Sequence, residues 1–421
     1  MHPARDTCSS SRVLIQAAMS WRAVAASAVG GLRLGRSADA GAIGDTASGP
    51  VTGGRIRRLD KVIPTQHYGT DKARVGMAAD RITKDPRIDP RIKSLFGQFE
   101  LPSDLGDVPD RDALLEEAAS EEAVARTAMF KSFMDMADSE EAAPSAGLEL
   151  TEHRITSQPD GNLINLRLIR PSAIDTPACV YYIHGGGMAS LSCNDGNYRA
   201  WGRIIANQGV AVAMIDFRNC VTPSSVPEVA PYPAGLDDCV SGLQWLADNG
   251  SSLGIDPARI IVAGESGGGN LTLATGLRLE QEGRLHLIRG LFALCPYIAG
   301  SWPRPDLPSS VENNGILLDL HNNRGAMGYG IEELERGNPL AWPLFATTED
   351  VAGLVPTVIS VNECDPLRDE GIEFYRLLLR AGVPARCRQV MGTIHGTEVF
   401  PITCPDISRD TAAAIAAFAR E

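Results

Sequence analysis

The sequence is poor in aromatic residues and in long hydrophobic segments. Phe, Tyr and Trp make up 5% of its 421 residues, and no uncharged apolar stretch reaches about 18 residues, so no membrane-spanning helix is expected. Basic residues are also in deficit, because 39 Lys and Arg stand against 52 Asp and Glu, for a net charge of −13. This acidic balance lacks the electrostatic footprint of a protein that binds nucleic acid or an anionic membrane.

Cysteine is present but without a recognisable pattern. The nine cysteines are odd in number, no two have Cys-x-x-Cys spacing, and several lie inside apolar runs. These features argue against a disulfide framework and against a zinc site, and they favour buried thiols in a reducing compartment. We therefore expect a cytoplasmic protein.

Residues 1–76 differ in composition from the rest of the chain, because arginines and small residues dominate them and acidic residues are few. Two interpretations fit: a flexible extension before a folded protein that begins at Met77, or a targeting segment. In either case we expect this segment to take no part in the chemistry.

Beyond Met77 the hydrophobic pattern becomes regular. Apolar residues at near-helical spacing predict one amphipathic helix over 111–135, with an apolar face formed by Leu114, Leu115, Ala118, Val124 and Met129. Two alternating segments at 148–157 and 162–170, joined by a Pro-Asp-Gly turn, predict a pair of adjacent strands.

Short apolar runs then alternate with helix-length segments. The runs predict strands at 178–183, 210–215, 259–263, 290–294, 357–361 and 386–391, and the segments between and after them predict helices at 198–207, 235–249, 267–282, 369–381 and 407–420. This alternation indicates an α/β fold with a mostly parallel central sheet flanked by helices. About 60 residues separate the strands at 290–294 and 357–361, far more than a usual crossover, and such an insertion is a place for a lid or a specificity element.

A Gly-x-Ser-x-Gly motif at 264–268 joins a predicted strand to a predicted helix. This strand–turn–helix setting is that of a nucleophile elbow, in which small neighbours allow the strained turn that projects Ser266 above the sheet. The alternative is an ordinary glycine-rich turn with an incidental serine.

A second glycine motif follows another predicted strand, where His184 precedes three consecutive glycines. We expect the backbone N–H groups of Gly186, Gly187 and Gly267 to form an oxyanion hole, because glycine leaves the approach to these groups open. A phosphate-binding loop is the alternative, but neither a following Gly-Lys-Ser/Thr nor a Gly-x-Gly-x-x-Gly occurs. We expect no cofactor and no metal.

The general base and its acid follow from position along the chain. Among seven histidines, His395 is the one that follows the last predicted strand at the carboxyl edge of the sheet. Asp365 lies in the turn after the strand at 357–361 and completes the order Ser…Asp…His; Glu363 and Asp369 are the alternatives, although Asp369 better suits the start of the next helix. His395 would take the Ser266 proton, and Asp365 would fix the histidine tautomer.

These motifs resemble those of the hormone-sensitive lipase branch (HGGG, bacterial family IV) of the α/β-hydrolase esterases. The resemblance extends from about Met77 to the C-terminus and rests on the motifs at 184–187, 264–270, 365–371 and 395–396. Two residues depart from the usual pattern, since Glu265 and Gly267 stand where the family usually has Asp and Ala.

The resemblance implies a catalytic domain at 146–421 and a helical cap built from 77–145 and an insertion at about 298–345. It also implies hydrolysis of short-chain acyl or aryl esters through an acyl-enzyme, and some members with a similar motif style act on monoalkyl phthalates. Apolar residues of the insertion could line the substrate pocket or pack the insertion onto the core: Trp302, Leu307, Ile316, Leu317, Met327 and Trp342.

The sequence leaves other functions open. The same fold could serve a non-catalytic ligand-binding protein, and the same triad could serve an amidase or an acyltransferase, because pocket shape selects the leaving group and acceptor. The expected partner is a small-molecule ester, and a homodimer is one option for assembly.

Overall fold

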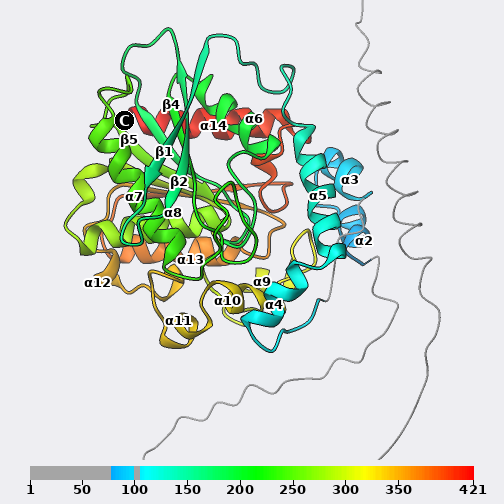
Figure 1. Ribbon diagram of the computed structural model, residues 1–421. Coiled ribbons are helices and arrows are strands. Elements are labelled where there is room, and N and C mark those ends of the chain that lie inside the picture. Colours follow the sequence, from blue (N-terminus) through cyan, green and yellow to red (C-terminus); the bar gives the residue numbers. More distant parts are fainter. Residues whose placement is uncertain (1–76, 99–104) are drawn as a thin grey trace, which may run out of the picture. The chain divides into compact units, whose positions relative to one another are not determined.

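The computed structural model describes residues 77–98 and 105–421, so both interpretations of residues 1–76 lie outside the described residues. Within this part of the chain, one mixed β-sheet forms the centre (Figure 1). Its strands are β1 Leu148–Thr156, β2 Leu163–Pro171, β3 Cys179–Ile183, β4 Ala211–Asp216, β5 Ile260–Glu265, β6 Gly290–Leu294, β7 Thr357–Asn362 and β8 Ala385–Val390.

The strand order across the sheet is β1-β2-β4-β3-β5-β6-β7-β8. The first two pairings, β1 with β2 and β2 with β4, are antiparallel, and all the others are parallel. The predicted mostly parallel sheet is therefore confirmed. Because parallel strands end at the same edge, the loops that follow β3, β5, β6, β7 and β8 are brought to one edge of the sheet.

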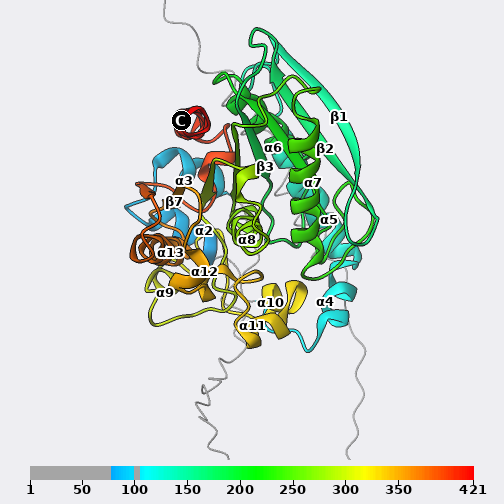
Figure 2. The same cartoon turned by 90° about the vertical axis from the view of Figure 1, so that its left-hand side faces the viewer.

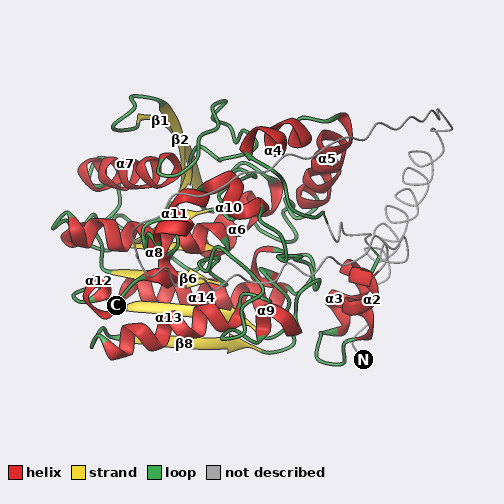
Figure 3. Ribbon diagram, turned by 90° about the horizontal axis from the view of Figure 1, so that it is seen from below, coloured by secondary structure: helices red, strands yellow, loops and turns green. Residues whose placement is uncertain are grey.

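Helices cover both faces of this sheet. The longer ones are α2 Met77–Lys84, α3 Pro90–Phe96, α4 Arg111–Ala118, α5 Glu121–Asp135, α6 Gly196–Ala206, α7 Ala234–Asn249, α8 Gly267–Gln281, α13 Arg368–Arg380 and α14 Pro405–Arg420. Helices α6 and α14 pack together on one face, while α7, α8 and α13 lie over the other (Figures 1 and 3). Every residue of β3 to β7 is buried, as expected for strands covered on both sides.

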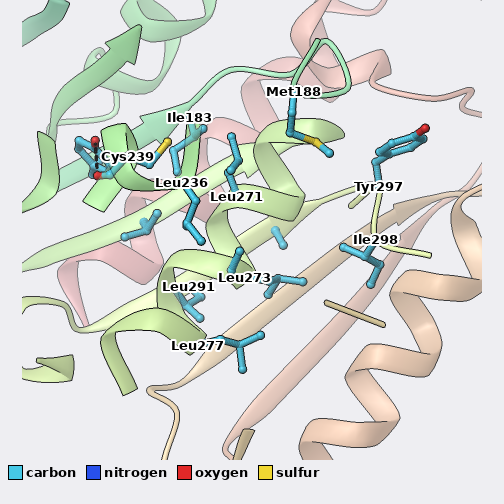
Figure 4. Close-up of a cluster of buried hydrophobic side chains, with 14 of the residues drawn as sticks. Ile183, Met188, Leu236, Cys239, Leu271, Leu273, Leu277, Leu291, Tyr297 and Ile298 are labelled. Carbon is cyan, nitrogen blue, oxygen red and sulfur yellow. Dashed lines mark hydrogen bonds between the residues drawn. The ribbon is translucent and has the colours of Figure 1, made fainter. Parts of the chain in front are cut away.

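A hydrophobic core cluster includes buried residues of the sheet and of the helices α7 and α8. Figure 4 shows Ile183 of β3, Leu236 of α7, Leu271 of α8 and Leu291 of β6 among its members. Their contact fixes α8 against the strands, and α8 begins directly after Ser266. The core therefore holds the turn that carries the candidate nucleophile.

The predicted single helix over 111–135 is wrong, because the structure contains two helices, α4 and α5, with a break between them. The Ser120 hydroxyl accepts a hydrogen bond from Ala123 N and so caps the start of α5. This new start changes the rotational phase of the second helix. Val124 and Met129, expected on the apolar face, are accordingly 55% and 39% exposed.

The insertion between β6 and β7 consists of short helices: α9 Ser309–Glu312, α10 Arg324–Tyr329, α11 Ile331–Arg336, the 3-10 helix η2 Pro343–Phe345, and α12 Thr348–Val351. Two further 3-10 helices are η1 Leu285–Leu287, before β6, and η3 Thr397–Val399, before α14. Helix α10 contacts α4, and the Arg324 guanidinium donates to the Glu117 carboxylate at 2.8 Å (Figure 2). Trp302, Leu307 and Trp342 are buried in the same cluster as the sheet core, so these residues pack the insertion onto the core.

No helix in the described residues is long and apolar enough to span a bilayer. The eight cysteines in this part of the chain are free thiols, and all except the half-buried Cys387 are buried.

Candidate active site

Ser266 occupies a strained turn between β5 and α8. Its φ and ψ angles are 57° and −119°, a region that is costly for any residue with a side chain. The turn is held from both sides, since Ser266 N donates to Leu294 O at 2.9 Å and Ser266 O accepts from Tyr297 N at 3.0 Å. A Cβ on Gly264 would lie 2.5 Å from the carbonyl oxygens of Ile183 and Gly268, so the turn requires glycine there.

His395 links Ser266 to Asp365. Its Nε2 lies 2.8 Å from Ser266 Oγ, and its Nδ1 lies 2.8 Å from Asp365 Oδ2. Since an ionised carboxylate can only accept, Nδ1 carries the proton of the neutral ring, and Nε2 of that neutral form is left to accept from the serine hydroxyl. The three residues come from the ends of β5, β7 and β8, and the structure brings all three together as the sequence predicts.

The surroundings of His395 favour its protonated form. Burial of the ring lowers its pKa, but the Asp365 carboxylate and the neighbouring Cys295 thiol outweigh burial, and the pKa is raised well above the ordinary value. Asp365 is fully buried and its Oδ1 accepts from Leu367 N at 2.9 Å. The carboxylate is thus held by the turn that carries it.

The glycine-rich loop after β3 lies directly against the elbow. Gly186 and Gly187 have φ values of 93° and 65°, which are accessible to glycine at little cost. A Cβ on Gly267 would lie 2.7 Å from Gly187 N and 2.5 Å from Met188 N, so the two main chains are in close approach. Gly267 is the first residue of α8, and N–H groups at a helix start have no intrahelical acceptor.

Glu265 connects the elbow to this loop, a role that the sequence reasoning missed. Its buried carboxylate accepts hydrogen bonds from the hydroxyls of Tyr182 and Tyr198 and, at 2.8 Å, from Gly185 N. Burial raises its pKa, while the two tyrosine hydroxyls act against that rise. A carboxylate in a buried strand next to Ser266 was the available signal, because such a group needs several donors.

The alternative acids lie elsewhere. Glu363 accepts from Gly392 N at 2.7 Å through Oε2. Asp369 stands in the first turn of α13, where its carboxylate accepts from Ser309 N at 2.7 Å and pairs with Arg368. Asp365 is therefore the one of the three that contacts His395.

Two other histidines of the described residues, His184 and His321, make contacts away from Ser266. His184 stacks on Phe217 with ring centroids 4.4 Å apart, and its Nε2 lies 3.3 Å from Asp216 Oδ1. His321 Nε2 lies 2.8 Å from Ser310 O. Neither contacts Ser266.

Cys295 is a further member of the site that the sequence reasoning missed, although its place directly after β6, beside β5 in the sheet, was a usable signal. Ligand atoms of Cys295, Asp365 and His395 all lie within 4.8 Å of one another, a set that could hold a metal ion. Metal binding would compete with the hydrogen bond between His395 Nδ1 and Asp365, since that bond already uses both groups. Burial raises the pKa of the Cys295 thiol to about 11.

A mostly parallel sheet with a Ser–His–Asp arrangement and a glycine-rich loop at its carboxyl edge defines the class of α/β hydrolases. A family model described as alpha/beta hydrolase fold matches residues 180–399, and the chain belongs to this family.

Relatives of the chain are esterases. The chain is 32% identical over 229 residues to esterase LipI of Mycobacterium tuberculosis, and the aligned region covers 54% of this chain and 67% of that protein. It is 31% identical over 264 residues to carboxylesterase NlhH of the same species, covering 61% of this chain and 78% of that protein.

Solved structures of esterases are also similar. Esterase Est22 is 68% identical, with a TM-score of 0.80 over 80% of this chain and 98% of that one. Brefeldin A esterase, described as a bacterial homologue of human hormone-sensitive lipase, is 33% identical with a TM-score of 0.70 over 80% and 94% of the two chains. The chain is thus a carboxylesterase-like enzyme of this branch, which confirms the fold and the resemblance stated from the motifs.

Proposed function

We propose that the protein hydrolyses short-chain acyl or aryl carboxylic esters through an acyl-enzyme on Ser266. The observation that carries this proposal is the pair of 2.8 Å distances that join Ser266 Oγ, the His395 ring and the Asp365 carboxylate. This connected arrangement favours catalysis over ligand binding alone, because it supplies a nucleophile, a base and an orienting acid in reach of one another.

In the proposed mechanism, His395 Nε2 takes the hydroxyl proton as Ser266 Oγ attacks the ester carbonyl carbon. The N–H groups of Gly186, Gly187 and Gly267 donate to the resulting oxyanion, and one such donor contributes about 3–4 kcal/mol in kcat. The intermediate collapses with transfer of the proton from His395 to the departing alkoxide, which leaves as the alcohol. Water then attacks the acyl-enzyme by the same route, with Asp365 stabilising the imidazolium in both halves.

We further propose that the helices of 77–145 and the insertion at about 298–345 form a cap over the site. Hydrogen bonds between the two segments support a common unit, since Arg111 donates to Gly328 O at 3.4 Å and Asn323 donates to Val108 O at 2.8 Å. A cap over this edge would select small ester substrates by shape.

The test uses p-nitrophenyl esters, a choice supported by the related esterase Est22, which has been solved with p-nitrophenol. We expect a burst of p-nitrophenol followed by steady turnover, and loss of several orders of magnitude in kcat for Ser266→Ala with the fold retained. A Ser266→Ala protein with the wild-type rate would refute the proposal.

Substrate series separate the remaining functions. The series varies the acyl chain and the alcohol of the ester and includes monoalkyl phthalates. We expect the highest kcat/KM for short-chain or aryl esters. Faster turnover of the matching amides would indicate an amidase, faster acyl transfer to an added alcohol than to water would indicate an acyltransferase, and binding without turnover would indicate a ligand-binding protein.

A further inference from the structure

The same tripeptide occurs twice around the start of α3: Asp-Pro-Arg at 85–87, before the helix, and at 89–91, where Asp89 is the N-cap residue. In each copy the aspartate carboxylate accepts from the main-chain N–H and the guanidinium of the arginine two residues later. Each aspartate therefore orients its own arginine. The remaining N–H groups of each guanidinium are left to contact other parts of the chain.

Arg87 contacts the insertion and, through it, the turn that carries Asp365. Its Nη1 donates to Glu312 Oε1 at 2.5 Å and its Nη2 donates to Asn313 Oδ1 at 3.0 Å. Asn313 is fully buried, and its Nδ2 donates to the main-chain oxygens of Asp365 at 3.0 Å and Glu363 at 3.3 Å. Because Arg87 holds the amide oxygen, the amide nitrogen of Asn313 must face the two carbonyl groups.

The same segment also contacts the loop before His395. Asp89 N donates to Gly392 O at 2.9 Å, and Gly392 N donates to the Glu363 carboxylate at 2.7 Å. Cys364 N donates to Thr393 O at 2.9 Å. The turn of the acid and the loop of the histidine are thus joined to each other, and residues 85–89 are bonded directly to the loop of the histidine and, through Asn313, to the turn of the acid.

We propose that Arg87 is a positioning residue that acts through Asn313 to hold the Asp365 turn in register with His395. This inference rests on the proposed function. Arg87 touches neither Ser266 nor His395 in the structure, so its effect is on the geometry of the 2.8 Å bond between Asp365 and His395. A displacement of about 1 Å at a catalytic group can lower the rate by about 100-fold.

The second copy of the tripeptide supplies a matched control. Arg91 is held by Asp89 as Arg87 is held by Asp85, and its Nη1 donates to Asp406 Oδ1 at 2.6 Å. Asp406 lies in the first turn of α14 and not in the Asp365 turn. Arg91→Gln therefore removes the same kind of ion pair without removing the link to Asn313.

The experiment compares Arg87→Gln and Arg91→Gln in the full chain with p-nitrophenyl acetate over a range of pH, with thermal unfolding measured alongside. We expect Arg87→Gln to lower kcat by about 10- to 100-fold with KM within about twofold. We also expect the acid limb of kcat/KM to move to lower pH, because a displaced Asp365 no longer favours the charged imidazole. Arg91→Gln is expected to keep kcat and the position of the limb.

Two further variants make the result decisive. Asn313→Ala is expected to reproduce the effect of Arg87→Gln, and the double variant to fall no further than the larger single effect, because the two residues act in series. Equal kcat and equal acid limbs in Arg87→Gln and Arg91→Gln would overturn the positioning role. Ser266→Ala with wild-type turnover would instead overturn the proposed function, so the two failures are distinguishable.

Discussion

Replacing Gly267 with alanine tests how closely the glycine-rich loop must approach the elbow. Alanine is the usual residue at this position in the family that the motifs resemble, so the change is conservative by sequence. In this structure a Cβ at 267 would lie 2.5 Å from Met188 N, 2.7 Å from Gly187 N and 2.8 Å from Gly187 C. All three are main-chain atoms, so they can separate only if the loop itself moves by several tenths of an ångström or more.

In the proposed mechanism, such a movement would displace the Gly187 N–H from the place where the oxyanion forms. Since loss of one oxyanion donor costs about 100- to 1,000-fold in kcat, we expect Gly267→Ala to lower kcat by about 100-fold with little change in KM. The assay is steady-state hydrolysis of p-nitrophenyl acetate, with the melting temperature measured on the same preparations.

Gly276→Ala is the control for this experiment, because Gly276 lies in the same helix and its added Cβ would meet the Leu291 Cδ1 tip at 2.5 Å. A side-chain tip can turn aside, so we expect Gly276→Ala to keep the wild-type kcat. A Gly267→Ala enzyme whose kcat lies within about threefold of wild type would refute the reasoning, because the donor would then tolerate the added methyl group.

Two other predictions concern pH and the N-terminal segment. His395 acts as a base only when neutral, and its pKa is raised well above the ordinary value because the effect of Asp365 outweighs that of burial. We therefore expect kcat/KM to rise with pH along a limb centred above about 6.5. A flat profile between about pH 5 and 9 would contradict the assignment of His395 as the base. A chain that begins at Met77 is expected to match the full chain in melting temperature and kcat, because the change of composition at Met77 indicates an extension that takes no part in the chemistry. An insoluble or inactive product would show that residues 1–76 are needed.

The central sheet and the three residues at its edge follow from the sequence because local patterns specify them. The apolar runs that became β3 to β7 are buried on both faces, and such strands need no polar alternation to be recognised. Ser266 and His395 each follow a strand, and the shared carboxyl edge of parallel strands brings such positions together. The motifs and their positions after predicted strands were thus enough to predict the meeting of Ser266, Asp365 and His395, with Glu363 and Asp369 as the alternatives to Asp365.

Contacts between distant segments are not specified in this way. Asn313 reaches Asp365 across an insertion of short helices that has no clear periodicity. The break between α4 and α5 was also missed, because the Ser120 cap competes with a continuous apolar spacing that would favour one helix. In both cases side-chain hydrogen bonds contribute to the arrangement, and hydrophobic periodicity carries no information about them.

The two departures from the usual elbow motif, Glu265 and Gly267, have opposite effects on volume and lie on either side of Ser266. The Glu265 carboxylate is one methylene longer than aspartate and bonds directly to Gly185 N at 2.8 Å, at the start of the glycine-rich loop. The absence of a methyl group at Gly267 leaves the room into which the same loop packs. We infer that the two residues compensate each other.

Their effects on kcat are therefore coupled. Gly267→Ala pushes the loop away while Glu265 still holds it, whereas Glu265→Asp withdraws the carboxylate from Gly185 N and so releases the loop to move away. We expect the double variant Glu265→Asp, Gly267→Ala to have a higher kcat than Gly267→Ala alone, since residues that share a contact surface are generally non-additive. If the fold-loss in kcat of the double variant equals the product of the two single fold-losses, the two positions act independently. Glu265 would then fix the position of the glycine-rich loop whatever residue stands at 267.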